Sequence, residues 1–170
     1  LTRKDVGLPE EGFVFCCFNT TYKITPTTFD SWARILKSVE DSVLIVFANN
    51  ELSKINLNKE ITLRGIDSDR LIFGDSVARP QYLDRYRVVD LFLDTHPYNA
   101  GTTASDALKM GLPMVTYLGN SYQARMGASI LTSINLPELI TNTPEEYESL
   151  AIELATNPEK LKIVKDKLVS

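Results

Sequence analysis

The sequence lacks the features that mark several classes of protein. None of its apolar runs approaches the roughly 20 residues of a membrane-spanning helix, and its first residues do not show the charged-then-apolar pattern of a secretory leader. The formal net charge is −4, with acidic and basic residues interspersed, which argues against general binding to nucleic acid or to an anionic membrane. No cluster of His or Cys has metal-ligand spacing. We therefore expect a cytoplasmic protein with no nucleic-acid, membrane or metal partner.

Cysteine is scarce, and its placement argues against a redox role. The two cysteines, Cys16 and Cys17, are adjacent within an apolar run. Neighbouring residues on a strand point to opposite faces, so these two are poorly placed to bridge each other. We expect both to be small thiols of the core. The chain starts at Leu1 rather than at methionine, which indicates a fragment of a longer protein.

What the sequence does contain is an alternation of short apolar runs with segments of helical period. Strands are expected at 13–19, 43–49, 70–75, 88–94 and 113–118. Helices are expected at 25–39, 80–87, 102–110, 121–134, 143–155 and 157–168, with a weakly periodic, charged segment between the second and third strands. This alternation predicts parallel strands joined by right-handed helical crossovers. The fold class is therefore α/β, with residues 1–170 forming a single Rossmann-like domain.

Helix boundaries are marked by capping residues. Thr25 followed by Pro26 is typical of a helix start, and Gly111 of a helix end. Thr143 and Glu146 have the spacing of a capping box, in which each residue's side chain caps the other's backbone N–H. These signals fix where the strands pass into helices.

The segment after the fourth strand, DTHPYNAGTTASDALKMGLPMVT at 94–116, is the most informative loop. Thr102 and Thr103 fall at a helix start, where unpaired N–H groups and a positive helix dipole suit a phosphate. Asp106, one turn further on the same face, could hold sugar hydroxyls, as acids do for ribose in other nucleotide folds. Alternatively, Thr102 is an ordinary N-cap and Asp106 an acid that interacts with the dipole. The residues alone favour neither interpretation.

Two better-known nucleotide fingerprints, GxGxxG and GxxxxGK[ST], are absent from the chain. The first absence argues against a nicotinamide-dependent enzyme. The tripeptide DSD at 67–69 has the form of a metal-binding DxD motif, but it precedes a strand. Ligands of open α/β sheets lie at the opposite, carboxyl ends of strands, so DSD is interpreted as a turn.

The stretch LFLDTHPYNAGTTASDALKMGLPMVT resembles the signature of the O-linked N-acetylglucosamine transferases and SPINDLY-type proteins, glycosyltransferase family 41. The resemblance continues in FCCFNTTYKITPTTFDSWARIL upstream and in YQARMGASILTSINLPELI downstream, so it covers nearly the whole chain. It implies the GT-B architecture, two Rossmann-like halves facing each other across a cleft. This chain resembles the carboxyl-terminal half, which holds most of the UDP-sugar. The amino-terminal half and any tetratricopeptide repeats would lie outside these residues.

The resemblance also implies roles for individual residues. Lys23 matches the family's diphosphate lysine, whose ammonium would stabilise charge on the departing β-phosphate. Thr102 and Thr103 match the phosphate-binding helix start, and Asp106 matches the ribose-holding acid. Arg85 matches an arginine near the uracil. Without the resemblance, Lys23 would be interpreted as a solvated loop lysine and Arg85 as a surface arginine.

Three positions bear on how closely the chain follows the family. Tyr82 stands where many members have a histidine that stacks near the nucleotide, and a tyrosine could stack as well. Gly101 replaces the histidine that animal members carry before the threonine pair, and backbone amides could substitute for it. His96 does not fill that role by its position in the sequence, and we interpret it as a loop residue.

These expectations combine into one functional hypothesis. The chain would bind UDP or UDP-N-acetylglucosamine without a metal or other cofactor, as part of an inverting transferase acting on Ser/Thr of proteins. Protein acceptors would bind through regions outside this chain, and the chain alone would be inactive. One alternative is a relative that transfers glucose or fucose. Another is a non-catalytic module that keeps the fold as a scaffold.

Overall fold

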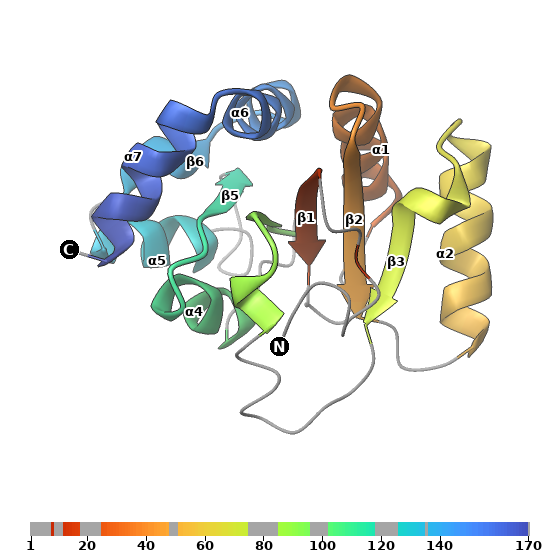
Figure 1. The fold of residues 1–170 in the computed structure, drawn as a ribbon, viewed down its shortest axis with the longest axis horizontal. Coiled ribbons are helices and arrows are strands. Elements are labelled where there is room, and N and C mark those ends of the chain that lie inside the picture. The colour runs from red at the N-terminus through yellow and green to blue at the C-terminus, as the bar shows by residue number, and fades with distance from the viewer. Residues whose placement is uncertain are drawn as a thin grey trace.

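The computed structural model describes residues 8, 12–17, 25–47, 51–74, 85–95, 102–117, 126–134 and 136–169. A parallel sheet of six strands forms the centre, in the order β3-β2-β1-β4-β5-β6 (Figure 1). The strands are β1 (Phe13–Cys17), β2 (Ser42–Phe47), β3 (Leu71–Gly74), β4 (Leu91–Leu93), β5 (Met114–Tyr117) and β6 (Ile140–Thr141). This is the strand order of the Rossmann fold. The predicted fold class is therefore confirmed.

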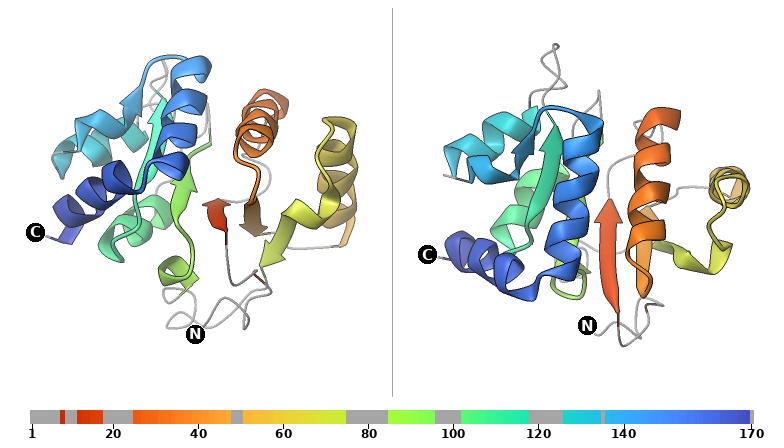
Figure 2. Two further views of the ribbon diagram at one scale, coloured as in Figure 1. Left: turned by 45° about the horizontal axis from the view of Figure 1, so that its top comes forward. Right: turned by 90° about the horizontal axis from the view of Figure 1, so that it is seen from above.

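Helices cover both faces of the sheet. They are α1 (Pro26–Ser38), α2 (Glu51–Leu63), α4 (Thr102–Lys109), α5 (Met126–Ser133), α6 (Pro144–Thr156) and α7 (Pro158–Val169). Short 3₁₀ turns are η3 (Ser68–Arg70), η4 (Arg85–Arg87) and η5 (Pro137–Leu139). Helix α1 lies between α2 and α6, and in the right-hand view of Figure 2 α1 and α6 lie in front of the strands while α4 lies behind them.

The central strands are buried as their continuous apolar sequences predict. Strand β1 pairs with β2 on one side and with β4 on the other, both in parallel. Its residues Cys16 and Cys17 are fully buried, so the expectation of core cysteines is confirmed. The large side chains of Trp32 and Tyr147 pack from α1 and α6 into the same core.

The predicted helix caps are also present. Thr25 Oγ1 accepts a hydrogen bond from Thr28 N at 3.2 Å, and Thr143 Oγ1 accepts one from Glu146 N at 3.1 Å. The reciprocal bond of the capping box is displaced by one residue, because Glu146 Oε1 accepts from Asn142 N at 3.4 Å. Gly111 follows α4 with a φ of 82°, a conformation that favours glycine.

The strand predictions need two corrections. The fourth strand covers Leu91–Leu93 rather than 88–94, because the side chain of Asp90 competes with the main chain there. Val14 N donates to Asp90 Oδ2 at 2.8 Å in addition to the backbone bond from Asp90 N to Val14 O. Strand β6 was not predicted, because its two residues carry no periodic pattern and exist as a strand only through pairing with β5.

The helical predictions need smaller corrections. The end of the helix expected at 80–87 is the 3₁₀ turn Arg85–Arg87, and 80–84 lie outside the described residues. The weakly periodic segment after β2 is the helix α2, in which Ile61 is the buried residue. Its pattern is weak because α2 covers the edge of the sheet, beside β3. The DSD segment forms η3 immediately before β3, with Asp67 Oδ1 accepting from Asp69 N at 3.1 Å, so its interpretation as a turn is confirmed.

Candidate functional site

The candidate site lies where the strand order reverses. Strands β1 and β4 are neighbours, with Phe15 opposite Leu91 and Cys16 opposite Phe92. The chain leaves β1 toward α1 on one face and leaves β4 toward α4 on the other (Figure 2). At such a switch point the connections diverge, and ligands of open α/β sheets bind outside the carboxyl ends of the strands. The adjacent carboxyl ends of β1 and β4 are therefore where a ligand of this sheet is expected.

Helix α4 begins at this edge. Its first residue is Thr102, so the predicted helix start is confirmed for the backbone. Asp106 lies one turn into the helix, with only 5% of its surface exposed. The end of α4 is fixed, since Met110 N donates to Asp106 O at 3.1 Å and Leu112 N to Ala107 O at 2.9 Å. The helix thus presents an N-terminus with its partial positive charge to the edge where an anion would bind.

The structure describes only part of the predicted site. Lys23 and Tyr82 lie outside the described residues. Arg85 opens η4 and Thr102 and Thr103 open α4, but their side chains are not described. Their predicted roles therefore rest on position in the chain. Of the predicted set, only the Asp106 side chain is located, and it is buried in the first turns of α4.

A buried polar network lies at the end of β4, and we did not predict it from the sequence. Thr116 Oγ1 donates to Asp94 Oδ2 at 2.7 Å, and Thr95 N donates to Asp94 Oδ1 at 2.8 Å. Tyr147 OH donates to Asp94 O at 2.9 Å and accepts from Trp32 Nε1 at 3.0 Å. An acid directly after an apolar strand was the one available signal. The network joins α1, α6, β4 and β5 at the edge that carries the candidate site.

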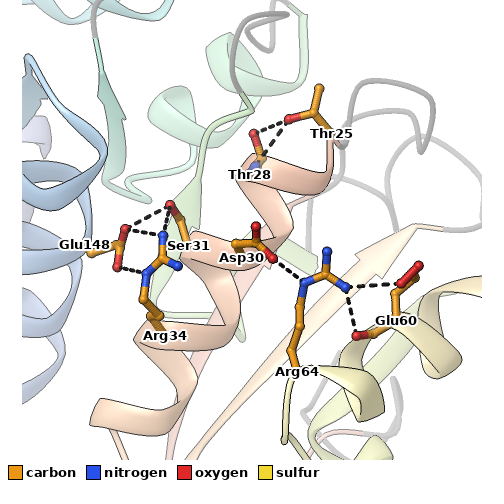
Figure 3. Close-up of polar contacts among 8 residues, drawn as sticks. All are labelled: Thr25, Thr28, Asp30, Ser31, Arg34, Glu60, Arg64 and Glu148. Atoms are coloured by element: carbon orange, nitrogen blue, oxygen red, sulfur yellow. Dashed lines mark hydrogen bonds and ion pairs between the residues drawn. The ribbon is translucent and has the colours of Figure 1, made fainter.

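A second polar cluster holds the helices on one face together (Figure 3). Arg34 Nε lies 2.6 Å from Glu148 Oε1, which joins α1 to α6, and this hydrogen bond raises the pKa of Arg34 above its ordinary value. Arg64 Nε lies 2.6 Å from Asp30 Oδ1, which joins the end of α2 to α1, and Arg64 Nη1 also reaches Glu60. These opposite charges are paired along the helices, so the cluster is structural.

Within the described parts of the chain, no three His, Cys, Asp or Glu side chains are grouped closely enough to hold a metal ion. Among the helices that the structure describes, none is long and apolar enough to cross a membrane.

Comparison with known proteins gives the family. The sequence model of glycosyl transferase family 41 matches residues 1–170. The chain belongs to glycosyltransferase family 41. It is 35% identical over 167 residues to a UDP-N-acetylglucosamine--peptide N-acetylglucosaminyltransferase of Caenorhabditis elegans, a match that covers 98% of this chain and 14% of the relative. The matched region is the carboxyl-terminal part of such relatives, as predicted.

Solved structures agree on the architecture. A mutant O-GlcNAc transferase of Thermobaculum terrenum superposes with a TM-score of 0.90 at 32% identity, over 93% of this chain and 31% of that one. The HepE protein of Anabaena, solved in complex with UDP and glucose, superposes with a TM-score of 0.69 at 18% identity, over 94% of this chain and 43% of that one, which shows likeness of fold alone. The six-stranded parallel sheet is thus one Rossmann-like half of the GT-B architecture. The chain spans less than a third of these O-GlcNAc transferase relatives.

Proposed function

We propose that residues 1–170 form a single domain that binds the UDP-sugar donor of an inverting, cytoplasmic transferase, which adds N-acetylglucosamine to Ser/Thr of proteins. The observation that carries this proposal is the start of α4 at the carboxyl edge of the sheet, in a chain of family 41. Helix starts at this position suit phosphate in other α/β folds. The names of the relatives favour UDP-N-acetylglucosamine as the donor and a protein as the acceptor.

In this proposal each predicted residue has one task. The amides and hydroxyls of Thr102 and Thr103 hold the diphosphate, and Asp106 accepts hydrogen bonds from the ribose hydroxyls. Arg85 and Tyr82 lie against the uracil. As the acceptor oxygen attacks the anomeric carbon, the bond from that carbon to the β-phosphate oxygen breaks, and negative charge accumulates on UDP. The Lys23 ammonium and the helix N-terminus stabilise that charge without a metal ion.

Two alternatives differ from this proposal in what they bind. A relative that transfers glucose or fucose would share the diphosphate contacts, because Lys23, Thr102 and Thr103 are assigned to the diphosphate and not to the sugar. A scaffold module would bind no nucleotide. The pairing of Lys23 with Thr102, Thr103 and Asp106 favours an enzyme, since the two segments follow adjacent strands and a scaffold has no need for both. The amino-terminal half, the acceptor site and any tetratricopeptide repeats would come from outside this chain.

The proposal is tested by calorimetric titration of the chain with UDP, with and without magnesium. Lys23→Ala and Asp106→Asn should each weaken UDP binding about tenfold or more, the size of one charge-assisted hydrogen bond, and magnesium should change nothing. Lys59→Ala and Asp166→Asn, which change exposed residues on α2 and α7, serve as matched controls and should bind UDP like the unmodified chain.

Equal binding by all four variants would contradict the proposed site. If the chain binds no UDP, the titration is repeated on the full-length protein. Absence of binding there as well would favour the scaffold alternative. On the full-length protein, activity that survives Lys23→Ala would contradict its role at the leaving group.

A further inference from the structure

The buried network at the end of β4 fixes the main chain at the point where it leaves the sheet. The last ladder bond of this strand is from Asp94 N to Val115 O, at 3.0 Å. Two side chains from other elements also hold Asp94. Thr116 donates a hydrogen bond to its carboxylate, and Tyr147 donates one to its carbonyl oxygen. Thr95 N completes the arrangement by donating to the same carboxylate.

Burial makes a carboxylate energetically unfavourable at this position. Asp94 is 2% exposed and Thr95 is fully buried, so the acid is removed from water. Burying an acid is costly unless it is hydrogen-bonded, and an apolar residue of similar size is often equally stable there. Both Asp94 oxygens accept a hydrogen bond, which holds the side chain in one orientation. The hydrogen bonds of Asp94 therefore fix the orientation of the backbone here, which apolar packing alone would not do.

The network extends beyond the direct partners of Asp94. Tyr147 OH donates to Asp94 O and accepts from Trp32 Nε1, and both of these aromatic side chains are buried. On the other side, Thr141 Oγ1 donates to Thr116 O at 2.8 Å, so the strand that carries Thr116 is itself held by β6. Asp94 is thus held by residues of two other elements, α6 and β5.

We infer that Asp94 is a positioning residue, which, held by Thr116 and Tyr147, fixes the carboxyl end of β4, from which the chain continues to α4. Its effect on nucleotide binding rests on the proposed function, because the first turn of α4 is the proposed diphosphate site. A shift of this strand end would displace the α4 N–H groups relative to the anion. Displaced donors make longer and weaker hydrogen bonds.

The test compares Thr116→Val, which keeps the shape but removes the donor, with Thr116→Ser, which keeps the hydroxyl. Ser42→Ala is the matched control, because Ser42 is also buried and its Oγ donates to Val39 O at 2.5 Å at the opposite edge of the sheet. Backbone hydrogen exchange is measured over 95–103 and over β2. Thr116→Val should speed exchange over 95–103 by about fivefold, as expected for one hydrogen bond of typical net strength.

In the same samples UDP affinity should fall about fivefold in Thr116→Val and be restored in Thr116→Ser, while Ser42→Ala changes neither quantity. Tyr147→Phe, which removes the donor to Asp94 O, should act in the same direction. Exchange over 95–103 that matches the unmodified chain in both Thr116→Val and Tyr147→Phe would overturn the inference. Exchange needs no ligand, so it decides the inference even if the chain fails to bind UDP, which would count against the proposed function alone. Faster exchange with unchanged UDP affinity would overturn the link to nucleotide binding.

Discussion

Arg70 shows how one side chain can terminate a helix that is distant in sequence. Its guanidinium donates to the carbonyl oxygens of Leu36 and Val39 at the end of α1, and to both oxygens of Ser42 at the start of β2. A cation at this position also complements the negative end of the helix dipole. Burial lowers the pKa of Arg70, while Asp41 and Asp67 raise it. The group stays protonated at neutral pH, because an arginine pKa starts far above 7.

At this scale we predict that Arg70→Met lowers the free energy of unfolding by about 2–3 kcal/mol, because it leaves partly buried carbonyl groups without a charged donor. Arg70→Lys should recover part of that loss, since a lysine keeps the charge but not the planar set of donors. Urea denaturation measures both variants. Lys59→Met on the exposed side of α2 should change stability by less than about 0.5 kcal/mol. Equal losses from the two methionine variants would contradict the capping role.

Between elements, α1 and α6 pack against each other on one face of the sheet (Figure 2). Arg34 makes a two-point contact with Glu148, with Nε–Oε1 at 2.6 Å and Nη2–Oε2 at 3.0 Å. Ser31 Oγ donates to the same carboxylate at 3.0 Å. The Arg34 side chain is 55% exposed and that of Glu148 is 12% exposed, so water screens the pair in part.

We predict a coupling free energy of about 0.5–1 kcal/mol between Arg34 and Glu148 in a double-mutant cycle of Arg34→Met and Glu148→Gln. The coupling should decrease in 1 M salt, in which the Debye length is only about 3 Å. The pair Lys160–Glu153, in which one ammonium contacts one carboxylate oxygen and the Glu153 side chain is 51% exposed against 12% for Glu148, provides the comparison cycle and should couple more weakly. A coupling for Arg34–Glu148 no larger than that of Lys160–Glu153 would show that the two-point geometry adds nothing.

The elements also show which features the sequence determines locally. The caps at Thr25, Gly111 and Thr143 were predictable because each depends on residues within a few positions. The short β4 depends on a contact between Val14 and Asp90, which are 76 positions apart, and no local pattern contains it.

The same reasoning separates the two parts of the candidate site. The helix start at Thr102 follows from its own sequence, so it was predicted. The hydrogen bond of Tyr147 to Asp94 spans 53 positions, and that of Trp32 to Tyr147 spans 115. The network that holds the end of β4 could therefore be found only in the folded chain.

For the whole molecule, the two thiols report on global opening. Cys16 and Cys17 are fully buried in the central strand β1, between β2 and β4. We predict that a thiol reagent such as 5,5′-dithiobis(2-nitrobenzoate) modifies neither cysteine at an appreciable rate in the native protein, and modifies both in concentrated urea. The labelling rate in Arg70→Met should rise about tenfold for each 1.4 kcal/mol of stability that the variant loses, because the open population depends exponentially on the free energy of opening. Rapid labelling of the native protein would indicate that β1 opens locally.

The position of β1 also has a consequence for the order in which the molecule assembles during synthesis. One edge of β1 can pair with β2 as soon as α1 and β2 have been made, whereas the other edge must wait for β4. Contacts between distant parts of a chain form late, because a long loop must close first. Tyr147, which fixes the end of β4, is made later still. As the chain leaves the ribosome, the edge that we assign to the nucleotide is therefore completed after the rest of the central sheet has formed.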